Sequence, residues 1–335
     1  MTAQQSYEQG ITKNRRGDFK GAIVDFTQSL TFNPLFAEAY NQRGQAYYYQ
    51  KEYQKAVEDF TRALQLDPLL VKALFYRGNT WRKLGENQKA VEDLTLVIAR
   101  QYRLDAAYNN RGLAYANLQD YAAAIEDYGR ALKINTTNYK FYYNRGRAYY
   151  LAGDKQAAIR DFDTTLRLNI KYTKAYINRG LSYYHIAEYH QAIQNYNLAL
   201  KLEPRNVYAY YNRGCVYSHL KDYHSAIQDY SKAVEIDPTF VKAFMNRGLA
   251  KLKSGDEPGA NKDFYHVMCI NAEAYTFYQA QRGTPEGKPV AKQAPQIDYS
   301  NRSKYFNTTI SVWDKEDVSQ LGTHPVFLEG EFLDG

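Results

Sequence analysis

The sequence predicts an all-α protein built from eight stacked two-helix repeats. A glycine, an alanine and an acidic residue each recur every 34 residues, eight times, without an insertion or a deletion. The glycines are Gly10, Gly44, Gly78, Gly112, Gly146, Gly180, Gly214 and Gly248; the alanines run from Ala22 to Ala260 and the acids from Asp18 to Asp256. Such a strict period indicates an array in which each repeat packs on its neighbours.

The period sets the domain boundaries. With Gly10 as the eighth residue of its repeat, the predicted repeats are 3–36, 37–70, 71–104, 105–138, 139–172, 173–206, 207–240 and 241–274. A short helix at about 275–282 is expected to cap the array, because the end face of a repeat stack needs a cover. The repeat domain is therefore predicted to span 1–282. A Gly- and Pro-containing linker at 283–297 and an acidic, aromatic tail at 298–335 follow it.

The first helix of each repeat is predicted from the spacing of its large residues. Tyr108, Arg111, Gly112 and Tyr115 lie at i, i+3, i+4 and i+7, which places them on one face of a helix. The small residue allows a close helix crossing, and the large ones fill the space beside it. Most of the 34 tyrosines recur at fixed repeat positions, so they are expected to fill helix interfaces.

The second helix of each repeat begins after the recurring acid. Asp120, for example, can cap the helix that follows, because its carboxylate accepts hydrogen bonds from the first-turn N–H groups. Asp67-Pro68, Glu203-Pro204 and Asp237-Pro238 are expected to end this helix, since proline cannot continue it. The turn is less well defined in the repeats that lack this proline and carry Tyr102, Thr136, Ile170 or Ala272 instead.

Composition narrows the class of protein. The chain has 335 residues, 43 Lys or Arg against 36 Asp or Glu, and two cysteines, too few for a disulfide framework. No apolar run is long enough to cross a membrane, and the N-terminus does not resemble a signal peptide, so a cytoplasmic protein is expected. Without a Gly-rich phosphate loop, a nucleophile elbow or a metal-ligand cluster, the sequence predicts no enzyme, no cofactor and no metal site.

These positions resemble the tetratricopeptide repeat family. The fourth residue is aromatic in most repeats, as in Tyr40 and Tyr108, and the twenty-fourth is Phe or Tyr in seven, as in Phe26 and Tyr128. The resemblance covers about four-fifths of the chain, and the Asn-Arg-Gly sequence is similar to bacterial, especially cyanobacterial, members. It implies a right-handed α-solenoid superhelix whose concave groove is lined by positions 2, 5, 6, 9, 12 and 13 of each first helix.

Arginine and aspartate recur together at positions 7 and 23. Seven repeats carry each residue, as in Arg111 and Asp127. We expect each guanidinium to pair with an aspartate, because a matched carboxylate is not needed beside a free binding arginine; the sixth repeat carries Asn195 at position 23. The alternative is a track of arginines for phosphates or nucleic acid.

An asparagine ladder at position 6 is the first candidate binding element. It consists of Asn110, Asn144, Asn178, Asn212 and Asn246. A carboxamide both donates and accepts, which suits an extended peptide backbone, and the row resembles asparagine ladders that hold peptides in other solenoid proteins. In the alternative interpretation, these asparagines link adjacent first helices or belong to the family consensus.

Basic and aromatic residues accompany this ladder at the other groove positions. The candidate contacts are Lys140, Lys174 and Lys242, with Tyr143, Tyr150, Tyr184 and Tyr211. This composition favours a protein segment with acidic and apolar residues. About half of the tyrosines could instead pack one helix on the next.

The C-terminal tail offers one such segment. Six acids lie in the last 22 residues, together with a single lysine, and Trp313, Phe327 and Phe332 lie in or beside this stretch. We expect 298–335 to dock on the array, in the same molecule or through self-association; the alternative is a disordered tail.

The sequence thus predicts a non-enzymatic protein–protein interaction scaffold or assembly factor that grips an extended acidic or aromatic peptide. One alternative is a subunit that recruits substrates to an enzyme complex. An RNA-binding repeat protein is a weaker alternative, since the basic charge is spread over the repeats and much of the arginine is matched by aspartate.

Overall fold

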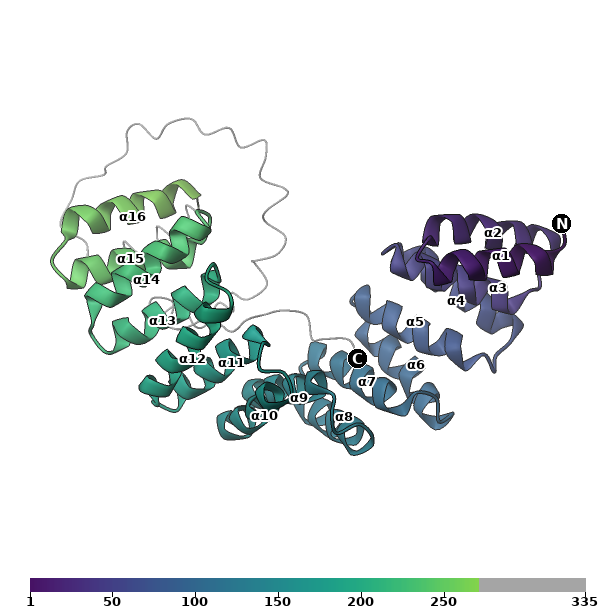
Figure 1. Cartoon of the computed structure of the whole chain (residues 1–335), viewed down its shortest axis with the longest axis horizontal. Helices are drawn as coiled ribbons and strands as arrows, with labels where there is room; N and C mark the ends of the chain where they lie inside the picture. Colours follow the sequence, from purple (N-terminus) through teal and green to yellow (C-terminus); the bar gives the residue numbers. More distant parts are fainter. Residues whose placement is uncertain (271–335) are drawn as a thin grey trace. The chain divides into compact units, whose positions relative to one another are not determined.

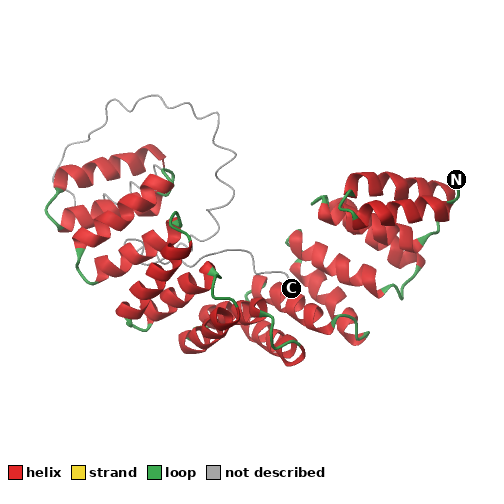
Figure 2. Cartoon of the chain, viewed as in Figure 1, coloured by secondary structure: helices red, strands yellow, loops and turns green. Residues whose placement is uncertain are grey.

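The structure is a computed structural model that describes residues 1–270. Sixteen α-helices and no strand are present in this range (Figure 2). They alternate with short turns, two per 34-residue repeat, so the predicted all-α solenoid class is confirmed. The predicted capping helix at 275–282, linker at 283–297 and tail at 298–335 lie outside the described residues.

Residues Met1–Ala175 form the first of two compact units. Its helices are α1 (Ala3–Arg15), α2 (Phe19–Phe32), α3 (Ala37–Tyr49), α4 (Tyr53–Leu66), α5 (Val71–Lys83), α6 (Asn87–Ala99), α7 (Leu104–Asn117), α8 (Tyr121–Ile134), α9 (Tyr139–Leu151) and α10 (Lys155–Leu168) (Figure 1).

The second unit begins at Tyr176, inside helix α11. Its helices are α11 (Thr173–His185), α12 (Tyr189–Leu202), α13 (Val207–His219), α14 (Tyr223–Ile236), α15 (Val241–Lys253) and α16 (Glu257–Ile270). In both units the odd-numbered helices are the predicted first helices of the repeats, and the even-numbered helices are the second.

The odd-numbered helices of the first unit form one continuous side. Each helix from α1 to α8 contacts the next one along the chain, as does α9 with α10, and α1, α3, α5, α7 and α9 also contact one another in sequence. No two even-numbered helices of this unit contact each other. The odd-numbered helices are therefore closer together and line the inner side of the unit's curve.

The recurring glycine is required by the ring that packs on it. A Cβ built on Gly44 would lie 2.8 Å from the Phe60 ring, and one on Gly112 would lie 2.9 Å from the Tyr128 ring. These rings are fully buried, as is the recurring alanine of the even helices, for example Ala56. Full burial of such a ring contributes about 2–3 kcal/mol of apolar transfer free energy. The glycine and the ring thus fix how closely the two helices of a repeat approach.

The recurring acid begins each even helix, as predicted, but only aspartate completes the cap. Asp120 accepts a hydrogen bond from the backbone N–H of Ala123, and Asp222 accepts one from Ser225. Glu188 occupies the same position before α12 without a capping hydrogen bond from its side chain. Glu52 and Glu86 behave in the same way.

In two repeats that lack the proline, an asparagine side chain stabilises the helix-ending turn. Asn135 and Asn169 precede the missing proline, and their side chains accept from the backbone N–H of Thr137 and Lys171. Asp67 makes the same contact with Leu69 in a repeat that has the proline. Helices α8 and α10 therefore end at the same repeat position as α4.

The third repeat lacks both the proline and this side chain. Gln101 stands where the other repeats place asparagine or an acid, and helix α6 ends one residue early, at Ala99. Gln101 and Arg103 adopt left-handed backbone conformations, with φ of 56° and 41°. The weaker turn predicted at Tyr102 is confirmed, whereas the turns at Thr136 and Ile170 are regular.

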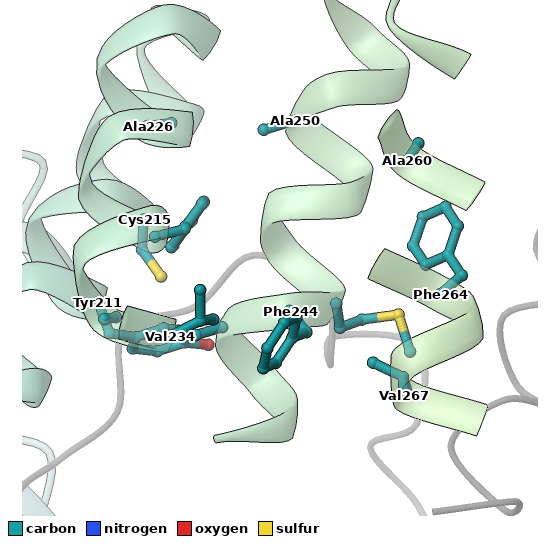
Figure 3. Close-up of a cluster of buried hydrophobic side chains, with 13 residues drawn as sticks. Tyr211, Cys215, Ala226, Val234, Phe244, Ala250, Ala260, Phe264 and Val267 are labelled. Carbon is teal, nitrogen blue, oxygen red and sulfur yellow. The ribbon is translucent and has the colours of Figure 1, made fainter. Parts of the chain in front are cut away.

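The core of the second unit shows how the aromatic residues are used. Tyr211 and Cys215 of α13 pack with Phe244 of α15 and Phe264 of α16 in one buried cluster (Figure 3). Small residues such as Ala226 complete it. The predicted use of tyrosine at helix interfaces is confirmed here, since Tyr211 and Tyr230 have 1% and 0% exposure.

Candidate peptide-binding face

The predicted arginine–aspartate pairs are confirmed in six repeats. Arg111 Nε donates to Asp127 Oδ2 at 2.7 Å, and its Nη2 donates to Oδ1 at 2.8 Å. The hydrogen bond to Asp127 raises the pKa of Arg111. The same two-bond geometry joins Arg43–Asp59, Arg77–Asp93, Arg145–Asp161, Arg213–Asp229 and Arg247–Asp263.

The third guanidinium nitrogen reaches back to the preceding repeat. Arg111 Nη1 donates to Thr95 Oγ1 at 2.9 Å, and Arg43 Nη1 donates to Thr27 Oγ1 at 3.0 Å. The Arg111 guanidinium also lies 5.8 Å from the ring centroids of Tyr108 and Tyr115. These arginines hold two even helices together, so they are not a free track for phosphates.

The asparagines of the first unit form a buried chain of side-chain amides. Asn144 of α9 donates to Asn109 at 3.0 Å, Asn109 donates to Asn110 at 2.9 Å, and Asn110 donates to Asn79 of α5 at 2.9 Å. Asn110 and Asn144 are 3% and 0% exposed. The contacts match the alternative in which asparagines link adjacent first helices; contact with a peptide stays a prediction.

The second-unit asparagines are buried as well. Asn178 and Asn212 have 0% exposure and Asn246 has 2%. Asn246 Nδ2 donates to the Tyr211 hydroxyl at 3.0 Å and approaches Cys215 Sγ at 3.6 Å. Burial raises the pKa of the Cys215 thiol to about 12.

Tyr143 and Tyr211 occupy equivalent places in the two units. The Tyr143 ring lies 5.8 Å from Phe162 and 4.9 Å from Tyr172. The Tyr211 ring lies 5.8 Å from Tyr230 and 4.9 Å from Phe240. Each ring therefore packs between the second helix of its own repeat and the turn that follows. This matches the packing alternative for part of the tyrosine set.

Tyr150 and Tyr184 are also buried, at 8% and 6% exposure. Lys155 Nζ lies 3.7 Å from the Tyr150 ring centroid, a cation–π contact. Tyr184 contacts the rings of Tyr189 and His219 edge-on or tilted, at 5.7 Å in both cases. Burial raises the pKa of both phenols, that of Tyr184 to about 12.

The three predicted lysines keep more exposure than the asparagines and tyrosines. Lys174 is exposed, and Lys140 and Lys242 are half-buried. Asn138 caps α9 through the backbone N–H of Lys140, which fixes the start of the helix that carries this lysine. The lysines are thus the predicted contacts with most surface.

Arg82 and Arg147 are prominent residues of the odd helices that the candidate set omits. They belong to α5 and α9, with exposures of 7% and 4%. Their repeat positions, 12 and 9, are among those that the family resemblance places in the groove. Both arginines could have been identified as candidates from the sequence, because each is a basic residue at one of these groove positions.

Among residues 1–270, no helix is both long and apolar enough to cross a lipid bilayer.

The family comparisons concern the repeats themselves. The tetratricopeptide repeat profile matches residues 37–68, 106–138 and 207–240, and two related repeat profiles match 139–169 and 188–221. No curated protein sequence matches the chain.

Solved structures share the fold. A tetratricopeptide repeat protein from Parabacteroides merdae is 19% identical with a TM-score of 0.57, covering 77% of this chain and 98% of its own. The C-terminal part of a repeat-containing protein from Cytophaga hutchinsonii is 19% identical with a TM-score of 0.58, covering 71% and 97%. The Cut9-Hcn1 complex gives 19% identity and a TM-score of 0.56, covering 72% and 48%.

Repeat profiles, helix pairs and structural neighbours agree. The chain is a tetratricopeptide repeat protein.

Proposed function

We propose that the chain is a non-enzymatic cytoplasmic scaffold or assembly factor that binds an extended acidic or aromatic segment of a protein on its odd-numbered helices. Proteins of this repeat family are generally non-catalytic and bind protein or peptide partners. The observation that carries the more specific proposal is the charge of helices α5, α7 and α9.

These three helices carry far more base than acid. Arg77, Arg111 and Arg145 are neutralised by the aspartates of the even helices. The same helices also carry five other basic residues, which are Lys72, Arg82, Lys83, Lys140 and Arg147. Their one acid is Asp105, which accepts a hydrogen bond from Asn135. Such a face attracts acidic segments and repels basic ones.

The amide chain supports a polar ligand on the same helices. Four carboxamides from Asn144 to Asn79 cross α9, α7 and α5, joined by hydrogen bonds of 2.9 to 3.0 Å. Buried polar groups are costly unless each is hydrogen-bonded. We propose that this row meets the backbone of a segment bound to the first unit when neighbouring side chains shift. Asn178, Asn212 and Asn246 would meet a segment bound to the second unit in the same way.

Recruitment of substrates to an enzyme would use the same face and differ only in the partner. RNA is a less suitable ligand, since six recurring arginines are held by aspartates. Binding to single-stranded RNA at low salt tests this alternative directly.

The proposed function is tested with an array of immobilised extended peptides of acidic, neutral and basic composition. The full chain is compared with Lys140→Glu on α9 and with Lys133→Glu, an exposed residue of the even helix α8. Both variants change the net charge equally, so non-specific attraction affects them alike. Circular dichroism and thermal unfolding report whether each variant is folded.

We expect the chain to retain acidic peptides that contain aromatic residues. Lys140→Glu should weaken the binding of these peptides about tenfold, the equivalent of about 1.4 kcal/mol in binding free energy. Lys133→Glu should leave their binding unchanged. Retention of no peptide class, or equal loss in both folded variants, would overturn the proposal.

A further inference from the structure

We propose that residues 314–335 of the chain itself occupy the basic face of α5, α7 and α9 in the same molecule. These residues are called the acidic segment below. The inference rests on the proposed function, because it names one occupant for the proposed face. It adds a regulatory consequence: the segment would compete with external partners.

The most buried basic groups of this face, Arg82 and Arg147, belong to the two first helices that contact α7. Burial raises the pKa of the Tyr128 phenol, and the positive charges of Arg147 and Arg82 both oppose that rise. The charges of α9 and α5 therefore both act on this phenol of the fourth repeat. Helix α7 is between them in the unit, since it contacts both α5 and α9. Helix α7 therefore has a helix that carries a buried arginine on each side.

Carboxylates are the chemical complement of this arrangement. A guanidinium pairs with a carboxylate through two parallel hydrogen bonds. The electrostatic attraction between the two groups is strongest where water is excluded. Arg82 and Arg147 are 7% and 4% exposed, so an anion that meets them gains more than one at the surface. Lys83 and Lys140, half-buried on the same helices, extend the positive charge around them.

The acidic segment has the matching composition. It holds Asp314, Glu316, Asp317, Glu329, Glu331 and Asp334 against one lysine, and it includes Phe327 and Phe332. Acids suit the two guanidiniums, and the phenylalanines suit a face that is rich in tyrosine. Helices α5, α7 and α9 carry one acidic residue, Asp105, so they add little negative charge that would repel the segment.

Covalent linkage favours this occupant over a separate protein. The 43 residues between Ile270 and Asp314 can span up to about 150 Å when fully extended. A tethered ligand with enough reach acts at an effective concentration on the order of millimolar. Even a weak pairing of acids with this face would then be populated in the isolated chain.

Zero-length cross-linking of the full chain tests the proposal. A carbodiimide joins lysine amines to carboxylates in contact, and mass spectrometry identifies the joined peptides. The ion pairs Lys89–Glu86 and Lys232–Glu235 provide internal positive controls, because their N–O distances are 3.1 and 2.8 Å. Mixing light chain with ¹⁵N-labelled chain separates links within one molecule from links between two.

We expect Lys83 or Lys140 to be linked to the acidic segment within one isotopic form. Absence of such links, while both control links form, would overturn the proposal. Links only between light and heavy chains would also overturn it and would indicate self-association.

A competition measurement provides the second readout. The tail variant combines Asp314→Asn, Glu316→Gln and Asp317→Asn. These substitutions lie outside residues 1–270, so the sequence of every described helix stays the same. The matched control neutralises three exposed acids of the even helices, Glu58→Gln, Glu92→Gln and Glu126→Gln. We expect the tail variant to bind an acidic peptide selected on the array about tenfold more tightly than the full chain, and the control to bind it unchanged.

The two proposals fail in different ways. If peptides bind but the cross-links are absent and both variants bind equally, the acidic segment is not the occupant and the proposed function stands. If the segment cross-links to Lys83 or Lys140 but no external peptide is retained even by the tail variant, the occupant is supported and binding of external partners is refuted.

Discussion

Arg145 lies opposite Gly129. At the repeat position of Gly129, the arginines of neighbouring repeats face a residue whose side chain accepts a hydrogen bond. A Cβ built on Gly129 would be 3.9 Å from Arg145 Nη1. In the neighbouring repeats, Arg77 and Arg111 donate at this place to Thr61 and Thr95 of the preceding even helix. Arg145 keeps its pair with Asp161 but lacks this link between repeats.

Gly129→Thr should therefore stabilise the chain. Removing a glycine from the interior of α8 gains about 0.5 kcal/mol, and a hydrogen bond to the charged Arg145 adds about 1 kcal/mol. Urea unfolding followed by circular dichroism measures the midpoint. Gly129→Val is the matched control, because it has the same shape without the hydroxyl. If Val stabilises as much as Thr, the link to Arg145 contributes nothing.

The glycine at the helix crossing should tolerate alanine differently from repeat to repeat. A Cβ on Gly112 meets the Tyr128 ring at 2.9 Å and a backbone oxygen at 3.2 Å, whereas a Cβ on Gly78 meets Leu94 Cγ at 3.0 Å. Both side chains are fully buried, but leucine can change rotamer, whereas the Tyr128 ring is rigid. We expect Gly112→Ala to cost about 1–3 kcal/mol and Gly78→Ala less. Equal unfolding midpoints for the two variants would contradict this reason for the glycine.

The Tyr128 hydroxyl is buried, and no group among residues 1–270 hydrogen-bonds to it. Phe26, Phe60 and Phe162 occupy the same repeat position and make the same contact with a glycine. Because an unsatisfied buried hydroxyl costs about 1–3 kcal/mol, Tyr128→Phe should raise the free energy of unfolding by about 1 kcal/mol. Chemical denaturation of both chains tests this, and a loss of more than 1 kcal/mol would show that the hydroxyl has a structural role.

Asp222 should make the stability of the α14 cap depend on pH. Hydrogen bonds from the side chain and the backbone N–H of Ser225 lower its pKa from the ordinary value of 3.8. A carboxylate with a lowered pKa stabilises the fold above its unfolded pKa, and this contribution is lost as the pH falls through the folded value. The advantage of the native chain over Asp222→Ala should therefore be full at neutral pH and smaller near about pH 3.

Thermal unfolding of both chains across this range gives the difference directly. Asp18→Ala provides a comparison at the equivalent cap of α2, where the side chain accepts from Gly21. A difference between the native chain and Asp222→Ala that is the same at both pH values would refute the assignment to the carboxylate.

The repeat register predicts most of the described fold, because each structural role recurs at one position. Gly112 and Tyr128 illustrate this: the small residue and the ring can be identified from the period alone. The period did not predict that Glu188 makes no side-chain cap, because it does not separate glutamate, whose longer side chain places the carboxylate differently, from aspartate. The helix ends at Asn135 and Asn169 were less certain, because the acceptor side chain carries the turn where proline is absent.

The candidate site was harder to predict, for a physical reason. Asparagine is compatible with a groove surface and with a hydrogen bond between helices, and the period is the same in both cases. Only the three-dimensional structure shows that the side chains of Asn144, Asn109 and Asn110 are joined by hydrogen bonds. Likewise, nothing in the spacing of Tyr143 indicates that its ring packs against Tyr172. Contacts between neighbouring repeats are not encoded in the pattern of one repeat.

Hydrogen–deuterium exchange of the full chain, with and without an acidic peptide selected on the array, tests the central claim most directly. We predict that the peptide slows amide exchange in α5, α7 and α9 and leaves the even-numbered helices α4, α6 and α8 unchanged. Protection confined to the even-numbered helices, at a peptide concentration that saturates binding, would contradict the assignment of the binding face.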